Sequence, residues 1–276
     1  MAKRKKLNVG LVVVILVLAV LSGALYGVYK VVDTVSKGDW QAEFDKGEAF
    51  LLAAEEAVGP ERSIEFRKAI EAYKEAIKNC DDPTKEMFLG LAKSYFGLLH
   101  DPRLTSIDRA KYWRSMEVGI SKSLKLDPTY VDALQLNVDR LWLAGVAQGG
   151  RPNYTPDYGG FVEATSRLIN ADPDNAEAYF RRGVACERQA VLDRDNLVLA
   201  EADFRKAIEI DPATALLRIG GLIRFLEANE RLEEAEQVHI EGIAANPDDT
   251  ELLRNYARSL YVQGRSIEAM EQLDKA

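Results

Sequence analysis

Residues 175–212 read NAEAYFRRGVACERQAVLDRDNLVLAEADFRKAIEIDP, and this stretch decides the fold. Its apolar residues recur at the i, i+3, i+4 and i+7 spacing of amphipathic helices, which predicts two helices in succession. Asp211-Pro212 ends the second helix, because proline lacks a backbone N–H and disfavours helix in the residue before it. Small residues such as Gly183 and Ala200 fall where paired helices would cross closely. The stretch therefore predicts a helix hairpin.

Prolines that would end a helix recur along the chain at similar intervals. Prolines that would end helices stand at positions 83, 128, 173, 212 and 247, so their spacings are 45, 45, 39 and 35 residues. The interval from Ala235 to Ala269 is 34 residues. Because one hairpin cannot bury its apolar face alone, we expect the hairpins to stack and share a continuous core.

A period that settles at 34 residues with two helices per unit resembles the tetratricopeptide repeat (TPR) family. That family's pattern is W-x2-L-G-x2-Y followed by A-x3-F-x2-A-x4-P. The matching positions are Ala69, Tyr73 and Ala76 in the first unit; Phe88, Leu91, Ala92, Tyr95 and Pro128 in the second; Tyr179, Gly183, Ala200, Phe204, Ala207 and Pro212 in the fourth; Ile219, Leu222, Leu226, Ala235 and Pro247 in the fifth; and Leu253, Ala257, Leu260, Ala269, Leu273 and Ala276 in the sixth. The third unit, around Leu134, Val138 and Leu141, matches weakly.

The resemblance covers residues 40–276. It implies an all-α, right-handed solenoid of about six stacked hairpins, with the first helix of each hairpin lining a concave groove. It also implies a non-catalytic module that binds proteins or peptides, with no cofactor.

Two features depart from the regular repeat. The interval between the small residue of the first helix and the corresponding position of the second is 12 residues in units five and six, but 24 in unit two and 23 in unit three. We expect these additions at the turn between the paired helices, on one rim of the solenoid. The last unit is incomplete at Ala276, so we expect either that the natural protein continues or that another surface covers the last helix.

The segment Leu7–Tyr29 contains no charged residue, and Lys3, Arg4, Lys5 and Lys6 precede it. As a helix it would span about 34 Å, enough for a hydrocarbon core of about 30 Å. The positive-inside rule places the basic residues 1–6 in the cytoplasm and the linker 30–39 and the repeats on the far side.

The alternative for this segment is a cleaved secretory signal, for which Ser22-Gly23-Ala24 offers small residues. The uncharged run is longer than the usual signal core, which favours an uncleaved transmembrane helix. Gly23 and Gly27 form a G-x-x-x-G pair that could serve as a dimer contact, giving a homo-oligomer. Glycine is also common in membrane helices, so a helix without a dimer is the other interpretation.

The composition argues against several classes of site. His100 and His239 are the only histidines, and Cys80 and Cys186 the only cysteines, so neither a multi-histidine metal centre nor a disulfide framework is expected. The chain carries −8 overall and its basic tail +4, which leaves −12 on the remainder. So acidic a domain is a poor candidate for nucleic-acid binding.

Counting in register with the resemblance gives the groove positions, which are rich in arginine toward the C-terminus. They are Lys93, Phe96, Asp139, Trp142, Arg181, Arg188, Arg224, Arg254, Asn255, Arg258 and Tyr261. Arginine and asparagine on a concave surface suit the capture of a carboxylate or an acidic peptide. The alternative is a solvated helix face with salt bridges to Glu187 or Glu227.

The segment 149–160, GGRPNYTPDYGG, is a second candidate recognition element. Its glycines and prolines suit a shaped loop, and Arg151, Tyr154 and Tyr158 are residue types typical of recognition surfaces. The alternative is an insertion that packs on its own rim.

These observations predict a single-pass membrane protein whose repeats bind proteins or peptides on the extracytoplasmic side. The layout of the N-terminus resembles bacterial inner-membrane TPR proteins, which implies a periplasmic repeat domain. One alternative is an interaction module of a longer enzyme with a catalytic domain beyond Ala276. Another is a binder of small acidic ligands or glycans.

Overall fold

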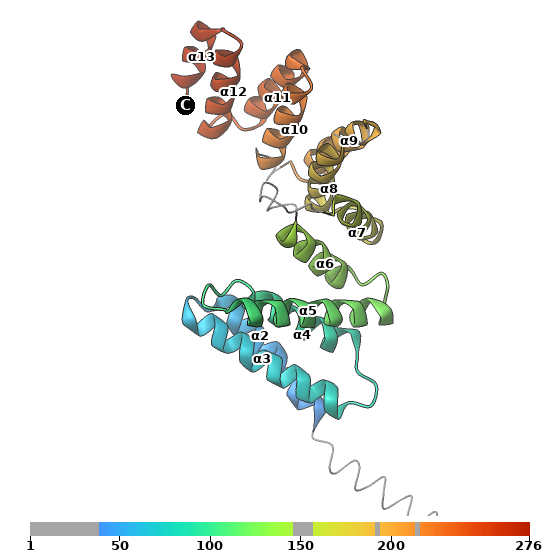
Figure 1. Cartoon of the computed structure of the whole chain (residues 1–276). Helices are drawn as coiled ribbons and strands as arrows, with labels where there is room; N and C mark the ends of the chain where they lie inside the picture. Colours follow the sequence, from blue (N-terminus) through green and yellow to red (C-terminus); the bar gives the residue numbers. More distant parts are fainter. Residues whose placement is uncertain (1–38, 146–156, 191–193, 213–215) are drawn as a thin grey trace, which may run out of the picture. The chain divides into compact units, whose positions relative to one another are not determined.

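The computed structural model describes residues 39–145, 157–190, 194–212 and 216–276. These residues form twelve α-helices, and they contain no β-strand (Figure 1). The chain divides into two compact units, residues 1–123 and 124–276. Within each unit, most helices that follow one another in the chain pack against one another, as the repeat pattern predicts.

The first unit contains α2 (Trp40–Glu56), α3 (Pro60–Asn79), α4 (Lys85–Leu98) and α5 (Ser106–Leu126), the last of which runs past the unit boundary. Helix α2 begins at Trp40 because the Asp39 carboxylate accepts the backbone N–H groups of Gln41 and Ala42, at 3.1 and 3.2 Å. Helix α3 has Pro60 in its first turn. Backbone N–H groups there have no partner within the helix, so the missing N–H of proline costs no hydrogen bond.

Tyr73 of α3 holds the first unit together. Its side chain is fully buried, and its ring fills gaps left by two glycines, Gly47 of α2 and Gly90 of α4. A Cβ at Gly90 would lie only 2.3 Å from Cζ of the ring. The Tyr73 hydroxyl donates a hydrogen bond to the Glu48 carboxylate, and burial raises the pKa of this hydroxyl further above its usual range.

The second unit contains α6 (Val131–Ala144), α7 (Tyr158–Ala171), α8 (Ala176–Gln189), α9 (Asp195–Ile210), α10 (Leu216–Ala228), α11 (Leu232–Ala245), α12 (Thr250–Val262) and α13 (Ser266–Leu273). The predicted helix stops are confirmed, because α5, α7, α9 and α11 each end one residue before an Asp-Pro or Asn-Pro pair.

Three rings on successive helices form the core of the middle of this unit. Phe204 lies between Phe180 and Phe225, with ring centroids 5.8 and 5.7 Å apart. A buried ion pair joins α8 to α9, where the Arg182 guanidinium donates two hydrogen bonds of 2.8 Å to the Asp203 carboxylate. This ion pair compensates the negative charge of the buried Asp203 carboxylate inside the hairpin.

The extra residues of the second repeat are shared between two places. Part of them forms the connection 99–105, and part lengthens α5 to 21 residues. The expectation that they all lie in the turn is therefore only partly right. The corresponding residues of the third repeat lie largely outside the described part of the chain.

The predicted transmembrane helix Leu7–Tyr29, with Gly23 and Gly27, also lies outside the described residues. Among the helices that are described, none is both long and apolar enough to cross a bilayer.

His239 of α11, the second helix of its repeat, is a polar member of the core. It is 1% exposed, and its ring stacks on Tyr256 of α12 with the centroids 4.9 Å apart. Burial lowers the pKa of the His239 imidazole to about 4, against the opposing effect of Glu227 and Glu236, while Arg258 lowers it further. His239 is therefore neutral at pH 7.

Replacing Gly90 by alanine should destabilise the first unit by about 1–3 kcal/mol, because the added Cβ collides with the buried Tyr73 ring. Urea unfolding of the full chain, with amide hydrogen exchange to locate the loss in α3 and α4, measures this. Gly220→Ala is the matched control: a Cβ there meets nothing within 4 Å, so the gain in helix propensity should stabilise α10 by about 0.5–1 kcal/mol. Equal effects of the two variants would contradict the assignment of Gly90 to a packing gap.

The buried imidazole should make stability depend on pH. Between the unfolded pKa of 6.5 and the folded pKa of about 4, the unfolded chain binds a proton that the folded chain does not, so stability falls as the pH drops. We expect a loss of about 2 kcal/mol between pH 7 and pH 5. His239→Phe keeps a ring against Tyr256 and should remove this part of the slope in urea unfolding. Identical slopes in both proteins would show that His239 is not the group responsible.

Candidate protein-binding groove

Helices α10 and α12 are the first helices of the last two repeats, and each presents one polar face to the same space. Gly220, Arg224 and Glu227 follow one another on α10 at i, i+4 and i+7, which places them on one face. On α12, Asn255 and Arg258 are spaced at i and i+3. The opposite side of α10 carries the buried Leu222 and Leu226, so core packing fixes the direction in which the polar face points.

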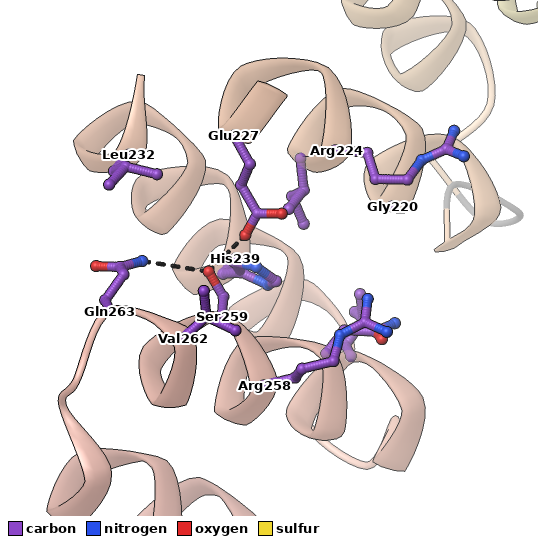
Figure 2. A pocket seen from close by; sticks show the side chains of 12 residues that line it. Gly220, Arg224, Glu227, Leu232, His239, Arg258, Ser259, Val262 and Gln263 are labelled. Carbon is purple, nitrogen blue, oxygen red and sulfur yellow. Dashed lines mark hydrogen bonds between the residues drawn. The ribbon is translucent and has the colours of Figure 1, made fainter. Parts of the chain in front are cut away.

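Two adjoining hollows lie along these faces. The hollow between α10, α11 and α12 has a volume of about 330 Å³, and Figure 2 shows its lining. The hollow between α8, α10 and α12 has about 370 Å³ and reaches Phe180. Both are lined by Gly220, Arg224, Leu252 and Asn255. We call the two together the α10–α12 groove.

Two arginines lie at the open side of this groove. Arg224 of α10 and Arg258 of α12 are both exposed, and neither forms a hydrogen bond or ion pair with another described residue. Figure 2 shows the two guanidinium groups extending from their helices on the same side of the hollow. They are available to a ligand that carries negative charge.

Three acidic side chains line the groove, Glu227 in the hollow between α10, α11 and α12, and Asp249 and Glu251 in the hollow that reaches Phe180. Glu227 has a hydrogen-bond partner. The Ser259 hydroxyl donates to the Glu227 carboxylate at 2.5 Å and accepts a hydrogen bond from the Gln263 amide at 3.3 Å (Figure 2). This chain of hydrogen bonds ties α10 to α12 and fixes the position of the Glu227 carboxylate.

His239 closes the inner end of the hollow between the two helices. Neither ring nitrogen has a hydrogen-bond partner within the described residues. A buried polar atom without a partner is rare, because its lost hydration is not replaced. The groove therefore combines two exposed cations with an unsatisfied polar group at its base.

Three of the predicted groove residues are brought together here, namely Arg224, Asn255 and Arg258. Arg254 and Tyr261 lie on α12 and are exposed, but they are not part of the lining. Arg188 is exposed in the last turn of α8. Together with Arg224, it opposes the rise in the pKa of the Glu187 carboxyl that burial causes.

Arg181 and Trp142 belong to a different cluster. The Arg181 guanidinium donates to Asp139 at 2.5 Å and to Glu177 at 2.7 Å, and it lies 5.4 Å from the centroid of the Trp142 ring. This set joins α6 to α8, so the solvated-face interpretation with salt bridges describes Arg181 better than a free binding residue does, although its partners are not the predicted ones.

The remaining predicted positions lie elsewhere. Lys93 is half-buried on α4 in the first unit, and Phe96 packs edge-on against His100 with centroids 5.1 Å apart. Tyr158 begins α7 and packs against the core there. Arg151 and Tyr154 lie outside the described residues, so the predicted recognition loop stays a prediction.

The sequence analysis missed Gly220, His239 and Ser259 as groove residues. Gly220 stands one helical turn before Arg224, and Ser259 directly follows Arg258, so extending the i, i+4 pattern would have found the first. His239 lies on the second helix of its repeat, and no sequence pattern shows that its nitrogens lack partners.

His100 and Asp101 are neighbours in sequence but have separate partners. Nδ1 of His100 lies 3.1 Å from the Phe96 carbonyl, whereas Asp101 accepts hydrogen bonds from Ser63 and Arg103. Within the described ranges, no group of three or more histidine, cysteine, aspartate and glutamate side chains could hold a metal ion.

Comparison with known proteins relates this arrangement to a repeat family. Residues 162–215 match the family model of the tetratricopeptide repeat, a stretch that begins in α7 and contains α8 and α9. The structure is similar to that of a tetratricopeptide repeat protein from Parabacteroides merdae, with a TM-score of 0.54 and 16% identity over 84% of this chain and 78% of the other. It is also similar to yeast Tom70, with a TM-score of 0.53 and 18% identity over 87% of this chain and 44% of Tom70.

At these identities the two structures establish a shared fold. The match over residues 162–215 adds the sequence signature of one hairpin and the helix before it. Together they show a helical fold of the tetratricopeptide type, with the sequence signature of that repeat over residues 162–215.

Proposed function

We propose that this protein is a membrane-anchored scaffold, without catalytic activity of its own, that binds an extended segment of a partner protein in the α10–α12 groove. One observation carries the proposal: two adjoining hollows share Gly220, Arg224, Leu252 and Asn255 and form one path along the first helices of successive repeats. An extended chain fits such a path better than a compact small molecule does, because the hollows adjoin along the direction in which the repeats stack.

The lining suits a peptide in its chemistry as well. Leu252 and Ile223 supply apolar surface, while Asn255 offers both a donor and an acceptor for a peptide main chain. The exposed Arg224 and Arg258 add positive charge and form no hydrogen bond or ion pair with another described residue. Protein interaction is the general role of the tetratricopeptide fold, which supports this assignment.

The anchor in the proposal rests on the sequence of the N-terminus. Leu7–Tyr29 is long and apolar enough to span a bilayer, and the four basic residues before it favour a cytoplasmic N-terminus. The repeats would then lie in the periplasm of a bacterial cell, against the inner membrane. Tethering raises the effective concentration of the groove for partners at the same membrane.

Blocking the groove should abolish binding without unfolding the repeats. Peptides selected by display against the full chain in lipid nanodiscs should bind Gly220→Leu and Arg258→Glu at least tenfold more weakly, because the first variant fills open space and the second reverses a charge. Arg194→Glu is the control, since it makes the same charge change at an exposed residue outside the groove. Fluorescence anisotropy gives the affinities. Unchanged binding to both groove variants would refute the proposed site.

The orientation can be tested independently of any ligand. In bacterial spheroplasts that express the full chain, protease added outside should degrade the repeats, while an epitope fused before Met1 should survive. Immunoblotting for the two ends measures this. Degradation of the repeats only after the membrane is lysed would place them in the cytoplasm and overturn the proposed topology.

A further inference from the structure

The hollow between α10, α11 and α12 has apolar walls and one polar group at its inner end. Ile223 and Leu252 are buried in its wall. His239 closes the inner end, where it is 1% exposed and neither Nδ1 nor Nε2 has a partner among the described residues. A buried polar group without a partner costs free energy that a ligand can restore. The hollow therefore favours an occupant that is apolar along its length and forms a hydrogen bond at its tip.

Two exposed apolar side chains stand at the opening of this hollow. Val262 is 80% exposed and Leu232 is 39% exposed, and both belong to its lining. Figure 2 shows Leu232 to the left of His239 and the guanidinium groups of Arg224 and Arg258 to its right. An apolar occupant would remove the surface of Val262 and Leu232 from water, which is favourable.

The charges of the α10–α12 groove nearly cancel. Its lining contains two cations and three anions, namely Arg224, Arg258, Glu227, Asp249 and Glu251. The groove as a whole therefore favours neither an anion nor a cation. Because His239 is neutral at pH 7, the polar tip of the occupant can pair with it without carrying a charge.

A phenol combines these properties. The tyrosine hydroxyl both donates and accepts hydrogen bonds, so it pairs with whichever nitrogen of His239 faces it, whereas indole only donates and a phenyl ring does neither. An apolar cavity of about 150 Å³ holds a benzene molecule. The hollow, at about 330 Å³, has room for the ring and the carbon that joins it to a main chain. Arginine guanidinium groups such as those of Arg224 and Arg258 are attracted to the face of an aromatic ring.

We propose that this hollow is the subsite for one tyrosine side chain in the extended segment of the partner protein; the inference rests on the proposed function. The tyrosine hydroxyl pairs with His239, and the ring lies between the apolar side chains of the wall and the opening. Gly220 admits the main chain of the segment, because a Cβ there would meet no atom within 4 Å and the space beside it is open.

The subsite should reject phosphotyrosine. A phosphate on the hydroxyl would carry nearly two negative charges to the inner end of the hollow. Glu227 already acts there: it opposes the lowering of the His239 pKa that burial causes, and the Ser259 hydroxyl holds its carboxylate in place. The phosphate would meet this like charge with only a neutral imidazole beside it. The subsite is therefore specific for the unmodified side chain.

The test uses the full chain in nanodiscs and three peptides with both ends capped, so that they carry no terminal charge. The peptides are acetyl-GSYSG-amide, acetyl-GSFSG-amide and the phosphotyrosine form of the first. Isotope labelling of histidine gives two imidazole signals, from His100 and His239, and the His239→Phe variant assigns them. His100 follows α4 in the first unit and serves as the internal reference. Titration of the His239 signal gives the affinities of the unchanged protein, and fluorescence anisotropy of labelled peptides gives those of the variants.

The tyrosine peptide should bind at least tenfold more tightly than the phenylalanine and phosphotyrosine peptides, and it should shift the His239 signal without shifting that of His100. In His239→Phe the advantage of tyrosine over phenylalanine should fall to less than about twofold, because the hydroxyl then has no partner.

A second variant tests the apolar wall. Val262→Asn should weaken both the tyrosine and the phenylalanine peptide about fivefold, since each loses apolar contact. Val198→Asn makes the same change at an exposed valine of α9 outside the hollow and should leave both affinities unchanged. Val262 is exposed, so this comparison remains informative even if His239→Phe folds poorly.

No binding of the tyrosine peptide, equal binding of the tyrosine and phenylalanine peptides, a preference for phosphotyrosine, or an unshifted His239 signal with the tyrosine peptide bound would overturn this inference. Display-selected peptides that still bind the groove and respond to Gly220→Leu would then leave the proposed function intact. Loss of that response as well would remove the groove itself.

Discussion

Aromatic rings that enter gaps left by glycine hold the helices of this protein together. Tyr73 fills the space at Gly47 and Gly90, and Phe204 fills the space at Gly183. Each ring comes from one helix and each glycine from a neighbouring one: Gly47 and Gly183 lie in the same hairpin as the ring that packs on them, whereas Gly90 lies in the next hairpin. Where a ring packs on a glycine of a neighbouring helix in this way, the contact fixes which face of that helix turns toward its neighbour.

The two adjacent glycines of α10 show what this constraint does for function. Gly221 is packed against Phe180, whereas a side chain at Gly220 would enter open space. Consecutive residues of a helix point about 100° apart, so packing of the first face leaves the second free. The packing that joins α8 to α10 thereby fixes the open face on which Arg224 stands, and the groove follows from the way the core is built.

The parts of this arrangement that depend on regular spacing could be predicted from the sequence. The helix stops before Pro128, Pro173, Pro212 and Pro247 were placed correctly, because the effect of proline is local. Asn255 and Arg258 were assigned to the groove by counting in register with the repeat family, and both line it. The helix hairpins from α8 onward could likewise be predicted, because they follow the regular spacing of the repeats.

The parts that depend on which side chains meet in space could not be predicted. Arg181 was predicted to line the groove together with Arg224. Its guanidinium instead donates hydrogen bonds to Asp139 and Glu177, because the packing of α6 against α8 brings Asp139 close to it. Arg254 has the same residue type and nearly the same register as Arg258, but it lies outside the lining. The missing partners of His239 are a property of its surroundings and have no sequence signature.

The unpartnered His239 also lowers the stability of one particular interface between the stacked helices. An unsatisfied buried donor costs about 1–3 kcal/mol, which is large beside a typical total stability of about 5–15 kcal/mol. In a repeat protein, stability is close to a sum over neighbouring units, so this cost falls on the interface between α10, α11 and α12. A ligand that satisfies His239 while contacting Arg224 and Arg258 would bridge two repeats and strengthen that interface. Binding of such a ligand would therefore raise the stability of this interface, because a ligand that binds only the folded state stabilises that state.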